Sequence, residues 1–445
     1  MSAGNGLTRR DLALRAAAAG PLLLPWAARG APAPSARITV AVIGLGAMGS
    51  GHLAYCVGDR SVQLLALCDV DRVRRDDGMR TVAASYGAQG ATNVKPYNDY
   101  REILARPDID AVLIATPDHW HTPISVHAAQ AGKDVYCEKP ISMNIAEGRR
   151  LVNVVREHAR VFQTGTQYRS ITTIRNVVRF VRRGGLGNVK HAFTLWSRTE
   201  GSYTPVSYPL PAEPVPDGLD WDLWVGPAPW RPYNSRFHRN PVPGGVPWAF
   251  CEDFGVASVT WHHSHAADVA QYALGVEETG PVEIIHPSAN RFPTLTFRYA
   301  NGTLLHLVED WGMVKNAYHA VPADARLEGN FGALYVGERG WVTSMYGSGR
   351  LEGAPESLFE EMGMPRHEGG WGQDHHGDWL ECIRTRNRTR TDGEVGHRAA
   401  SLGHLAHIGF KLQRSLKWDP VREVFPADPE ANRLCSRSMR EPWRL

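Results

Sequence analysis

A glycine-rich turn near the start of the chain is the first feature whose residue spacing indicates a chemistry. Its glycines have the spacing G-x-G-x-x-G and follow a continuous apolar run, Ile38–Ile43. The run predicts a buried parallel strand, and the segment to about Val57 after the turn suits a helix. Backbone N–H groups of such a turn and the helix N-terminus attract a pyrophosphate. We therefore expect a dinucleotide at Gly44, Gly46, Ala47, Met48 and Gly49.

An acidic residue at the end of a second apolar run, Val62–Cys68, supports this expectation. Asp69 lies 20 residues after Gly49, where a carboxylate hydrogen-bonds the ribose hydroxyls of a dinucleotide. A carboxylate repels a 2′-phosphate, so Asp69 favours NAD. NADP stays open, because three arginines that would accept this phosphate follow closely: Arg72, Arg74 and Arg75.

Further strands and helices alternate along the next hundred residues. The runs 111–115, 134–137 and 161–164 predict strands, and 124–131 and 146–158 suit helices. This alternation predicts a doubly wound parallel sheet, in which ligands lie beyond the carboxyl ends of the strands. The side chains expected at these ends, beside the cofactor, are Thr116, Pro117, His121, Glu138, Lys139 and Gln167.

Several longer motifs together resemble the Gfo/Idh/MocA oxidoreductase family, which includes glucose–fructose oxidoreductase and inositol dehydrogenase. The resemblance covers about residues 37–445, and its motifs are GLGAMG (44–49), ATPDHWH (115–121), EKP (138–140), GTQYRS (165–170), WDLWVGPAP (221–229), HAADVAQYALG (265–275), GALYVGERGWV (332–342) and EVGHRAASLGHLAHI (394–408). It implies an α/β fold with a Rossmann domain, 37–165. It also implies a substrate-binding and oligomerisation α/β domain, 166–445, with an open, mostly antiparallel sheet.

Patterns in the second half agree with that second domain. An Asn301-Gly302 pair between two apolar runs is a strong hairpin signal. The segment 202–255 is rich in proline and glycine, which predicts a long functional loop. Strands are expected at 191–196, 294–299, 303–308 and 334–336, and helices at 371–384 and 395–412.

Oxidation of an alcohol by hydride transfer needs a base for the hydroxyl proton. The resemblance gives this role to Lys139, next to a proline that often follows a cis peptide in the family, and gives the second catalytic position to His265. Asp268 lies three residues after His265, so on a helix it would share a face and orient the imidazole.

One position departs from the family pattern. The usual dehydrogenase pattern has an aspartate four residues before the catalytic histidine, and this chain has Trp261 there. Either His263 replaces that aspartate or the reaction differs. By family position Arg169 faces the substrate, as do Lys139 and His265, and Trp224 packs against the cofactor. For Asp374, His375 and His376, helix capping and exposure are favoured over a role in the site.

The first 36 residues form a segment of their own. Two arginines, Arg9 and Arg10, precede an apolar run and then a stretch of small residues and prolines, a pattern that resembles a twin-arginine export signal. A disordered basic tail on a cytoplasmic enzyme is the alternative. Because the twin-arginine route moves folded proteins, a periplasmic enzyme would bring its cofactor with it and hold it tightly.

The composition of the chain excludes several classes of ligand and partner. The net charge is only +3, and no basic stripe indicates nucleic acid. The six cysteines are scattered without zinc spacing, so we expect no metal, and no stretch after the signal is long and apolar enough for a membrane span. We expect a carbohydrate-oxidising enzyme, a homodimer or homotetramer, with its cofactor recycled in place. The alternatives are an NAD-dependent glycoside hydrolase or lyase working by transient oxidation, and a non-catalytic sugar or cofactor sensor.

Overall fold

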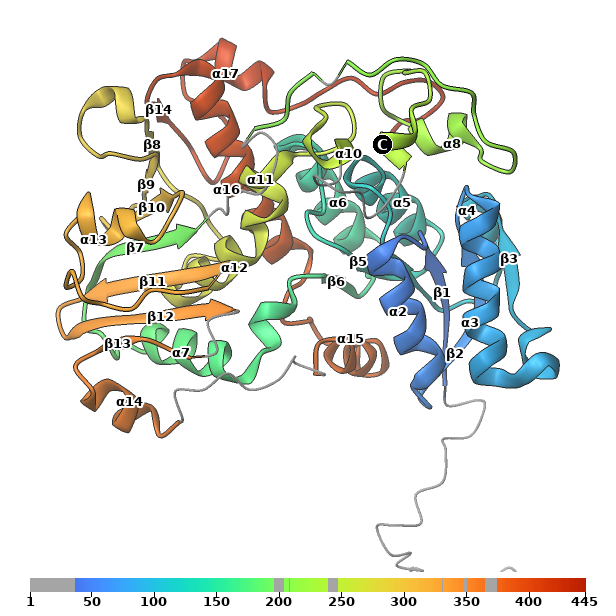
Figure 1. Ribbon diagram of the computed structural model, residues 1–445, viewed down its shortest axis with the longest axis horizontal. Helices are drawn as coiled ribbons and strands as arrows, with labels where there is room; N and C mark the ends of the chain where they lie inside the picture. Colours follow the sequence, from blue (N-terminus) through green and yellow to red (C-terminus); the bar gives the residue numbers. More distant parts are fainter. Residues whose placement is uncertain are drawn as a thin grey trace, which may run out of the picture.

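Two α/β units lie side by side in the computed structural model of the chain (Figure 1). The structure describes residues 37–195, 204–207, 209–238, 247–329, 331–346, 350–364 and 374–445. The predicted export signal, 1–36, lies outside these residues, as do parts of the predicted 202–255 loop. Among the described residues, no helix is long and apolar enough to cross a membrane.

The first unit contains a six-stranded sheet in the order β3-β2-β1-β4-β5-β6, with every neighbouring pair parallel. This order belongs to a doubly wound dinucleotide-binding fold and confirms the predicted Rossmann sheet. Apart from the edge strand β3, the strands are mostly or wholly buried, as their continuous apolar runs predict. Their bounds are β1 Ile38–Ile43, β2 Val62–Cys68, β3 Lys95–Tyr97, β4 Ala111–Ile114, β5 Asp134–Cys137 and β6 Phe162–Thr164.

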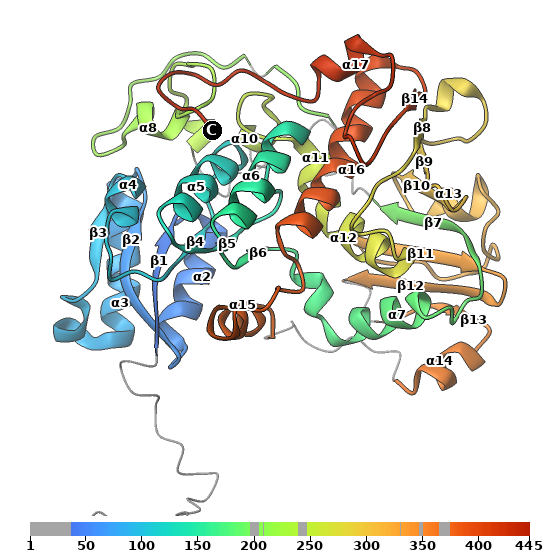
Figure 2. The same cartoon turned by 180° about the vertical axis from the view of Figure 1, so that it is seen from behind.

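Helices cover both faces of this sheet, with α2 and α3 in front in Figure 1 and α5 and α6 in front in Figure 2. One predicted helix, 124–131, begins earlier than expected, because α5 starts at Asp118 directly after Pro117. The helices of this unit are α2 Ala47–Gly58, α3 Arg72–Ala91, α4 Tyr100–Leu104, α5 Asp118–Gln130 and α6 Ile145–Glu157.

Segments from the far end of the chain complete the core of the first unit. Trp379 and Leu380 of α15 (Asp374–Thr385) pack with Val40 and Tyr136 of the sheet. On the other face, Trp443 meets Trp120 of α5 at a ring distance of 4.8 Å. The first unit therefore requires the C-terminal residues for its packing, which the predicted division at residue 165 does not convey.

The second unit contains an eight-stranded sheet in the order β13-β12-β11-β7-β10-β9-β8-β14. All neighbouring pairs are antiparallel except β10 and β7, which confirms the expected mostly antiparallel sheet. Gly302 lies in the predicted hairpin turn at φ +87°. The strands are β7 Val189–Leu195, β8 Glu283–Ile285, β9 Thr296–Arg298, β10 Leu304–Val308, β11 Phe331–Gly337, β12 Gly340–Tyr346, β13 Gly353–Ala354 and β14 Leu416–Lys417.

Three long helices, α7, α12 and α16, pack on one face of this sheet in a single apolar cluster. The other face is covered by residues around α13. The helical segments are η3 Gln167–Ser170, α7 Thr172–Arg182, α11 Ala257–Trp261, α12 His263–Leu274, η4 Pro287–Ala289, α13 Gly312–Asn316, α14 Ser357–Met362, α16 Gly393–Leu412 and α17 Pro429–Arg433.

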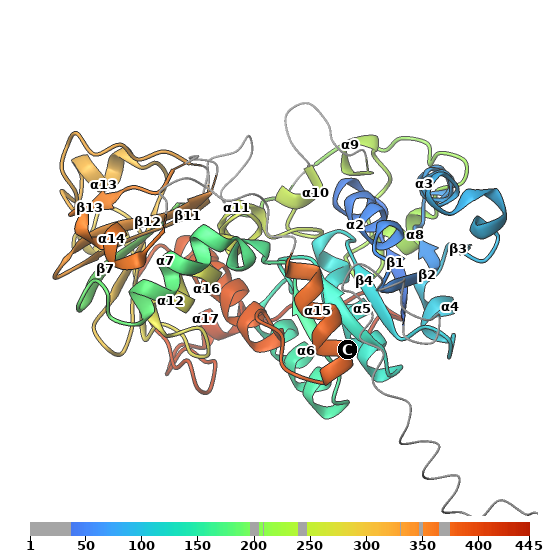
Figure 3. The same ribbon diagram turned by 90° about the horizontal axis from the view of Figure 1, so that it is seen from below.

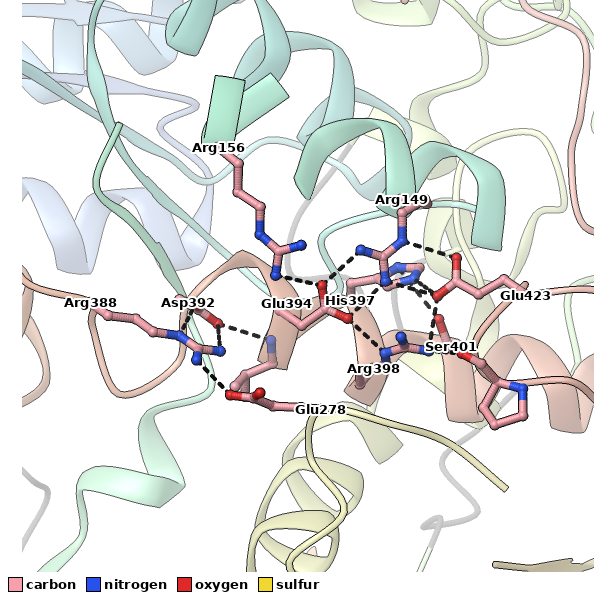
Figure 4. Close-up of polar contacts among 12 residues, drawn as sticks. Arg149, Arg156, Glu278, Arg388, Asp392, Glu394, His397, Arg398, Ser401 and Glu423 are labelled. Carbon is pink, nitrogen blue, oxygen red and sulfur yellow. Dashed lines mark hydrogen bonds and ion pairs between the residues drawn. The ribbon is translucent and has the colours of Figure 1, made fainter. Parts of the chain in front are cut away.

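A network of ion pairs joins the two units (Figure 4). Arg149 of α6 lies between Glu394 of α16 and Glu423, with four hydrogen bonds of 2.7–3.1 Å. Arg398 donates to Glu394 at 2.8 Å, and His397 lies 2.7 Å from Glu423. Both carboxylates are almost fully buried. The network therefore fixes α6 of the first unit against α16 of the second.

The predicted long loop contains short helices where it is described: α8 Trp221–Val225, α9 Ser235–His238 and α10 Pro247–Phe250. It lies against the start of α3, where Leu219 forms an isolated bridge with Asp71 and the His238 carbonyl accepts from Arg74 at 2.6 Å. Figure 3 shows α9 beside α2 and α10 near α11. The loop thus forms part of the wall beyond the carboxyl ends of the first sheet.

Candidate active site

A cavity of about 600 Å³ lies where these carboxyl ends face α11 and α12 of the second unit. The glycine turn and Asp69 line one part of it, and Lys139 and His265 line another. The structure therefore brings together residues that are more than 200 positions apart in the sequence. Of the residues predicted from strand ends, Thr116, Pro117, His121, Glu138, Lys139 and Gln167 all line this cavity.

The glycine turn is a concave stretch of backbone, and a side chain at Gly44 or Gly49 would clash with neighbouring backbone atoms. Gly44 has φ +88°, and a Cβ there would lie 2.6 Å from the Ala115 carbonyl oxygen. A Cβ on Gly49 would lie 1.9 Å from the Gly44 carbonyl oxygen. Only glycine allows β1, the turn and α2 to pack this closely, which leaves the N-terminus of α2 open toward the cavity. This geometry fits the pyrophosphate of a dinucleotide.

Asp69 is fixed at the end of β2 by two backbone donors. Its Oδ2 accepts from the Leu45 N–H at 2.8 Å and its Oδ1 from the Asp71 N–H at 2.9 Å. The carboxylate thus lies beside the turn, as a ribose-binding group must. Two of the three arginines that kept NADP open are engaged elsewhere: Arg74 donates to the His238 carbonyl, and Arg75 donates to the Asp69 carbonyl and to Asn98.

Lys139 follows β5 and precedes a cis peptide bond to Pro140, as the resemblance implied. Its Nζ donates to the Trp261 carbonyl oxygen at 3.2 Å and lies 4.5 Å from the centre of the Trp261 indole ring. Burial lowers the pKa of the Lys139 amine, and the nearby carboxyl groups of Glu138 and Asp118 oppose this shift. A lysine with a lowered pKa is suited to accept a proton near neutral pH.

Glu138 belongs to a hydrogen-bonded chain that the sequence did not reveal. Its Oε1 lies 3.0 Å from His52 Nε2 and accepts from Gln167 at 2.8 Å, and His52 Nδ1 lies 2.9 Å from His376 Nε2. Burial alone would raise the pKa of Glu138, but the contacts with His52 and the charge of Lys139 hold it at about 2. A charged, fixed carboxylate therefore lies next to Lys139.

His376 was expected at an exposed helix start, and the structure instead places it at the cavity. Its ring stacks on Tyr55 at 4.1 Å and on Tyr136 at 5.1 Å. His375 is buried and hydrogen-bonds Ser170 at 2.9 Å and the Thr164 carbonyl at 3.0 Å. The capping interpretation is therefore wrong for these two histidines. The contacts of α15 with the first sheet, which no local pattern shows, carry His376 to the site.

His265 lies in the cavity on the opposite side from the glycine turn. Its ring stacks on Tyr168 at 4.1 Å, and its Nδ1 has no hydrogen-bond partner among the described residues. Burial, with Lys139 nearby, lowers the pKa of His265 well below its usual range. A neutral imidazole with a free ring nitrogen is available to bind a hydroxyl or carbonyl oxygen of a substrate.

Asp268, predicted to orient His265, and Arg169, predicted to face the substrate, are engaged with each other instead. Asp268 shares α12 with His265, but its carboxylate pairs with Arg169, whose Nε donates to Oδ2 at 3.0 Å and whose Nη2 donates to Oδ1. Both members of this pair are buried. The prediction that Asp268 orients His265 is therefore corrected. Arg169 does not line the cavity and lies instead over Tyr272, at 4.4 Å.

The position that departs from the family pattern is occupied by an aromatic wall. Trp261 and His262 both line the cavity, with ring centres 4.3 Å apart. His263, proposed as a replacement for the missing aspartate, is buried away from the cavity, with its Nε2 2.9 Å from Thr194 Oγ1. His263 therefore cannot contact a substrate in the cavity, and Trp261 itself is the residue beside Lys139.

The remaining predicted residues position the walls. His121 links two strand ends, with Nδ1 2.7 Å from the Pro140 carbonyl oxygen and Nε2 2.8 Å from the Thr116 carbonyl oxygen. Trp224 of α8 lines the cavity, and its ring stacks on Trp221 at 4.6 Å. These contacts fix the positions of both side chains in the wall of the cavity.

Asp118, at the first position of α5, also lines the cavity and was not among the predicted site residues. It is 1% exposed, and its Oδ2 accepts from the Val256 N–H at 3.3 Å. Burial raises the pKa of Asp118, and Lys139 opposes this shift. The motif ATPDHWH contains the residue, but nothing in the sequence shows that α5 begins there.

Comparison with known families agrees with this geometry. Residues 38–166 match the NAD-binding Rossmann fold of the oxidoreductase family, and residues 174–344 and 370–445 match its C-terminal α/β domain. The chain belongs to the Gfo/Idh/MocA oxidoreductase family. The Rossmann unit, which contains the glycine turn and Asp69, thus matches the NAD-binding domain of this family.

Characterised relatives share about a quarter of their residues with the chain over the matched part. Myo-inositol 2-dehydrogenase of Thermotoga maritima is 28% identical over 42% of this chain and 51% of its own length. Levoglucosan dehydrogenase of Pseudarthrobacter phenanthrenivorans is 29% identical over 34% and 39%. A glycosyl hydrolase family 109 protein of Shewanella pealeana is 27% identical over 35% and 34%. The matches span about a third to a half of these relatives.

Solved structures share the fold over most of the chain. The aldose-aldose oxidoreductase of Caulobacter crescentus, complexed with glycerol, superposes with a TM-score of 0.56 at 19% identity, over 86% of this chain and 99% of that one. Levoglucosan dehydrogenase in complex with NADH and levoglucosan gives a TM-score of 0.58 at 17% identity, over 86% and 99%. At this identity the similarity shows the common two-unit fold.

Proposed function

We propose that this protein is an NAD-dependent oxidoreductase that acts on a hydroxyl group of a sugar, polyol or glycoside. The observation that carries the proposal is the partly buried Lys139 amine, whose pKa is lowered, in the same cavity as the glycine turn and Asp69. A proton acceptor and a dinucleotide cradle in one cavity are the two parts that alcohol oxidation needs.

When bound, the nicotinamide cofactor supplies the acceptor of the hydride. Lys139 takes the proton of the substrate hydroxyl, and the Trp261 carbonyl fixes the direction of its amine. His265 offers its free Nδ1 to a neighbouring substrate oxygen. The aromatic wall of Trp261, His262 and Tyr168 excludes water from the reacting atoms and matches the apolar face of a sugar ring.

The names of the relatives support a carbohydrate substrate, since they include an inositol dehydrogenase and a levoglucosan dehydrogenase. A second candidate is an NAD-dependent glycoside hydrolase or lyase that oxidises its substrate transiently. The matches to glycosyl hydrolase family 109 proteins favour it. Lys139 supports net oxidation, because it places a proton acceptor in the same cavity as the dinucleotide cradle. The same lysine argues against a non-catalytic sensor.

The proposal includes export and internal recycling of the cofactor. Its support is the arginine pair and the apolar run within residues 1–36. Outside the cytoplasm free NAD is scarce, so the enzyme would bind its cofactor tightly, oxidise one sugar and reduce another. Assembly as a homodimer or homotetramer through the second unit belongs to the same proposal and rests on the family resemblance.

Two measurements on one preparation test the proposal. The protein is purified without added cofactor and denatured, and the released nucleotide is identified by mass. The native holoprotein is then mixed with a panel of sugars, polyols and glycosides while the absorbance of reduced nicotinamide is followed. Bound NAD and its reduction by at least one carbohydrate are expected. Absence of nucleotide would refute tight binding, and no reduction by any carbohydrate, with NAD bound, would refute the oxidoreductase.

A further inference from the structure

In the buried carboxyl group of Asp118, one of the two oxygens has a hydrogen-bond partner among the described residues and the other has none. Oδ2 accepts from the Val256 N–H, whereas Oδ1 has no partner among the described residues. The residue is 1% exposed at the first position of α5. Burying an unsatisfied carboxyl oxygen is costly. A site that retains such a group has a use for it.

Lys139, from the end of the neighbouring strand β5, is the cationic group that lines the same cavity and has the larger influence on Asp118. Both line the cavity, and each shifts the pKa of the other. The described residues form no ion pair between them; the Lys139 amine donates to the Trp261 carbonyl instead. The two groups therefore lie at one cavity and influence each other's charge, while the buried Oδ1 has no partner among the described residues.

The other charged and titratable groups around Asp118 and Lys139 are either held by hydrogen bonds or have a fixed charge near pH 7. Glu138 is bound by His52 and Gln167, and the positive charge of Arg437 acts on Asp118 from the C-terminal segment. Burial lowers the pKa of both His262 and His265, which leaves them neutral near pH 7. Asp118 is therefore the group beside Lys139 whose charge is free to change.

We propose that Asp118 is a positioning residue whose carboxyl group controls the protonation of Lys139. The inference rests on the proposed function. With Asp118 protonated, Lys139 remains a neutral amine, ready to take the hydroxyl proton. As the alcohol is oxidised, its O–H bond breaks and an N–H bond forms on Lys139, while the C–H electron pair leaves as hydride to the NAD that the proposed function supplies. Ionised Asp118 would hold the proton on Lys139.

The variant Asp118→Asn tests the effect of the charge alone. It removes the carboxylate charge but keeps the side-chain shape and an oxygen that accepts from the Val256 N–H. Asp118→Glu keeps the charge, and Asp76→Asn, on the exposed surface of α3, is the matched control. The readout is the reaction of Lys139 with acetic anhydride across pH in the holoprotein, followed by mass spectrometry of its peptide. Only the neutral amine reacts, so the curve reports the pKa of Lys139 whether or not a substrate is known.

In Asp118→Asn we expect the labelling curve of Lys139 to move to lower pH by about one pH unit, because the carboxylate that favours the ammonium form is gone. Asp118→Glu should restore it toward the wild type, and Asp76→Asn should coincide with the wild type. Coincidence of the Asp118→Asn and wild-type curves would overturn the inference.

The wild type alone provides a second test if Asp118→Asn does not fold. Linked groups titrate together, so the Lys139 curve should depart from a single ionisation. A curve that fits one ionisation would overturn the inference. If the curves behave as expected but no carbohydrate reduces the bound NAD, the proposed function fails and the linkage stands. If carbohydrates reduce the NAD but the curves coincide, the linkage fails and the function stands.

Discussion

Lys139 and Trp261 come from different units of the molecule and meet across the cavity, with the amine 4.5 Å from the centre of the indole ring. The same amine donates to the Trp261 carbonyl at 3.2 Å. Trp261, which departs from the family pattern, thus positions Lys139, which keeps the pattern. An indole ring stabilises an ammonium group less than a carboxylate would, which helps Lys139 to remain a neutral base.

Replacing Trp261 by leucine removes the ring and keeps the backbone carbonyl. The cation–π interaction favours the ammonium form by ~1–2 kcal/mol at a desolvated site. We therefore expect the apparent pKa of Lys139 to fall by about one pH unit, measured from the pH profile of its labelling. Trp261→Phe, which keeps an aromatic face, should shift it less. Equal profiles for the leucine variant and the wild type would show that the ring does not act on the amine.

Replacing Lys139 by methionine tests the base directly. Removal of a general base lowers a rate by roughly 10²–10⁴-fold, so the reduction of bound NAD by an active sugar should fall by that factor. The nucleotide content of the purified protein should not change, because the glycine turn and Asp69 remain. Stopped-flow absorbance gives the rate, and mass analysis of released nucleotide gives the control. A rate within a few-fold of the wild type would exclude Lys139 as the base.

Gly49→Ala tests the cradle. The added Cβ would lie 1.9 Å from the Gly44 carbonyl oxygen, so α2 must move away from β1. We expect loss of bound nucleotide and a decrease of about 1–3 kcal/mol in the free energy of unfolding. Gly58→Ala on the same helix is the matched control, because its Cβ would meet nothing within 4 Å. Nucleotide retained at wild-type level in Gly49→Ala would contradict the assignment of the turn.

The ion-pair network between the units supplies a test of stability. Arg149 makes four hydrogen bonds to two buried carboxylates, whereas Arg156 makes one and its side chain is 59% exposed. We expect Arg149→Met to lower the free energy of unfolding by about 3 kcal/mol. Arg156→Met should cost less than ~1 kcal/mol. Denaturant titration measures both, and equal effects would show that burial does not set the strength of this network.

The same network predicts that the free energy of unfolding decreases at acid pH. Burial opposes ionisation, but Arg149 and its neighbours hold the pKa values of Glu394 and Glu423 at about 2, below the ordinary value of 4.5. The contribution is therefore complete above pH 4.5 and is lost as the pH falls toward 2. Unfolding of the wild type and of Glu394→Gln should converge over that range. A constant difference between them down to pH 2 would contradict the assignment.

The Rossmann half was predictable because its signals are local. Apolar runs such as Val62–Cys68 identify buried strands, and the polar residues after them fall at the ligand edge by topology alone. The roles of Asp268 and His376 were not predictable, because each depends on a partner from another segment. Arg169 forms a salt bridge with Asp268, and His52 forms a hydrogen bond with His376. Spacing along one helix shows which residues share a face but not which neighbour that face meets.

The burial of Asp118 is another feature that a local sequence pattern does not show. Its motif was visible, but its burial results from the packing of α5 against the segment around Val256, more than a hundred residues later. A carboxyl group becomes chemically unusual only when the whole fold removes water from it. The sequence therefore indicates the residues of the cavity wall but not the burial that makes the charge of Asp118 unfavourable.

The central claim is that a bound NAD exchanges hydride with a carbohydrate in this cavity. The most direct measurement uses holoprotein incubated with sugars, polyols and glycosides that carry deuterium on every carbon, followed by release of the nucleotide and determination of its mass. Transfer of deuterium to the nicotinamide from at least one carbohydrate is predicted, with no transfer in Lys139→Met over the same interval. Nucleotide that stays bound yet gains no deuterium from any carbohydrate would contradict the account.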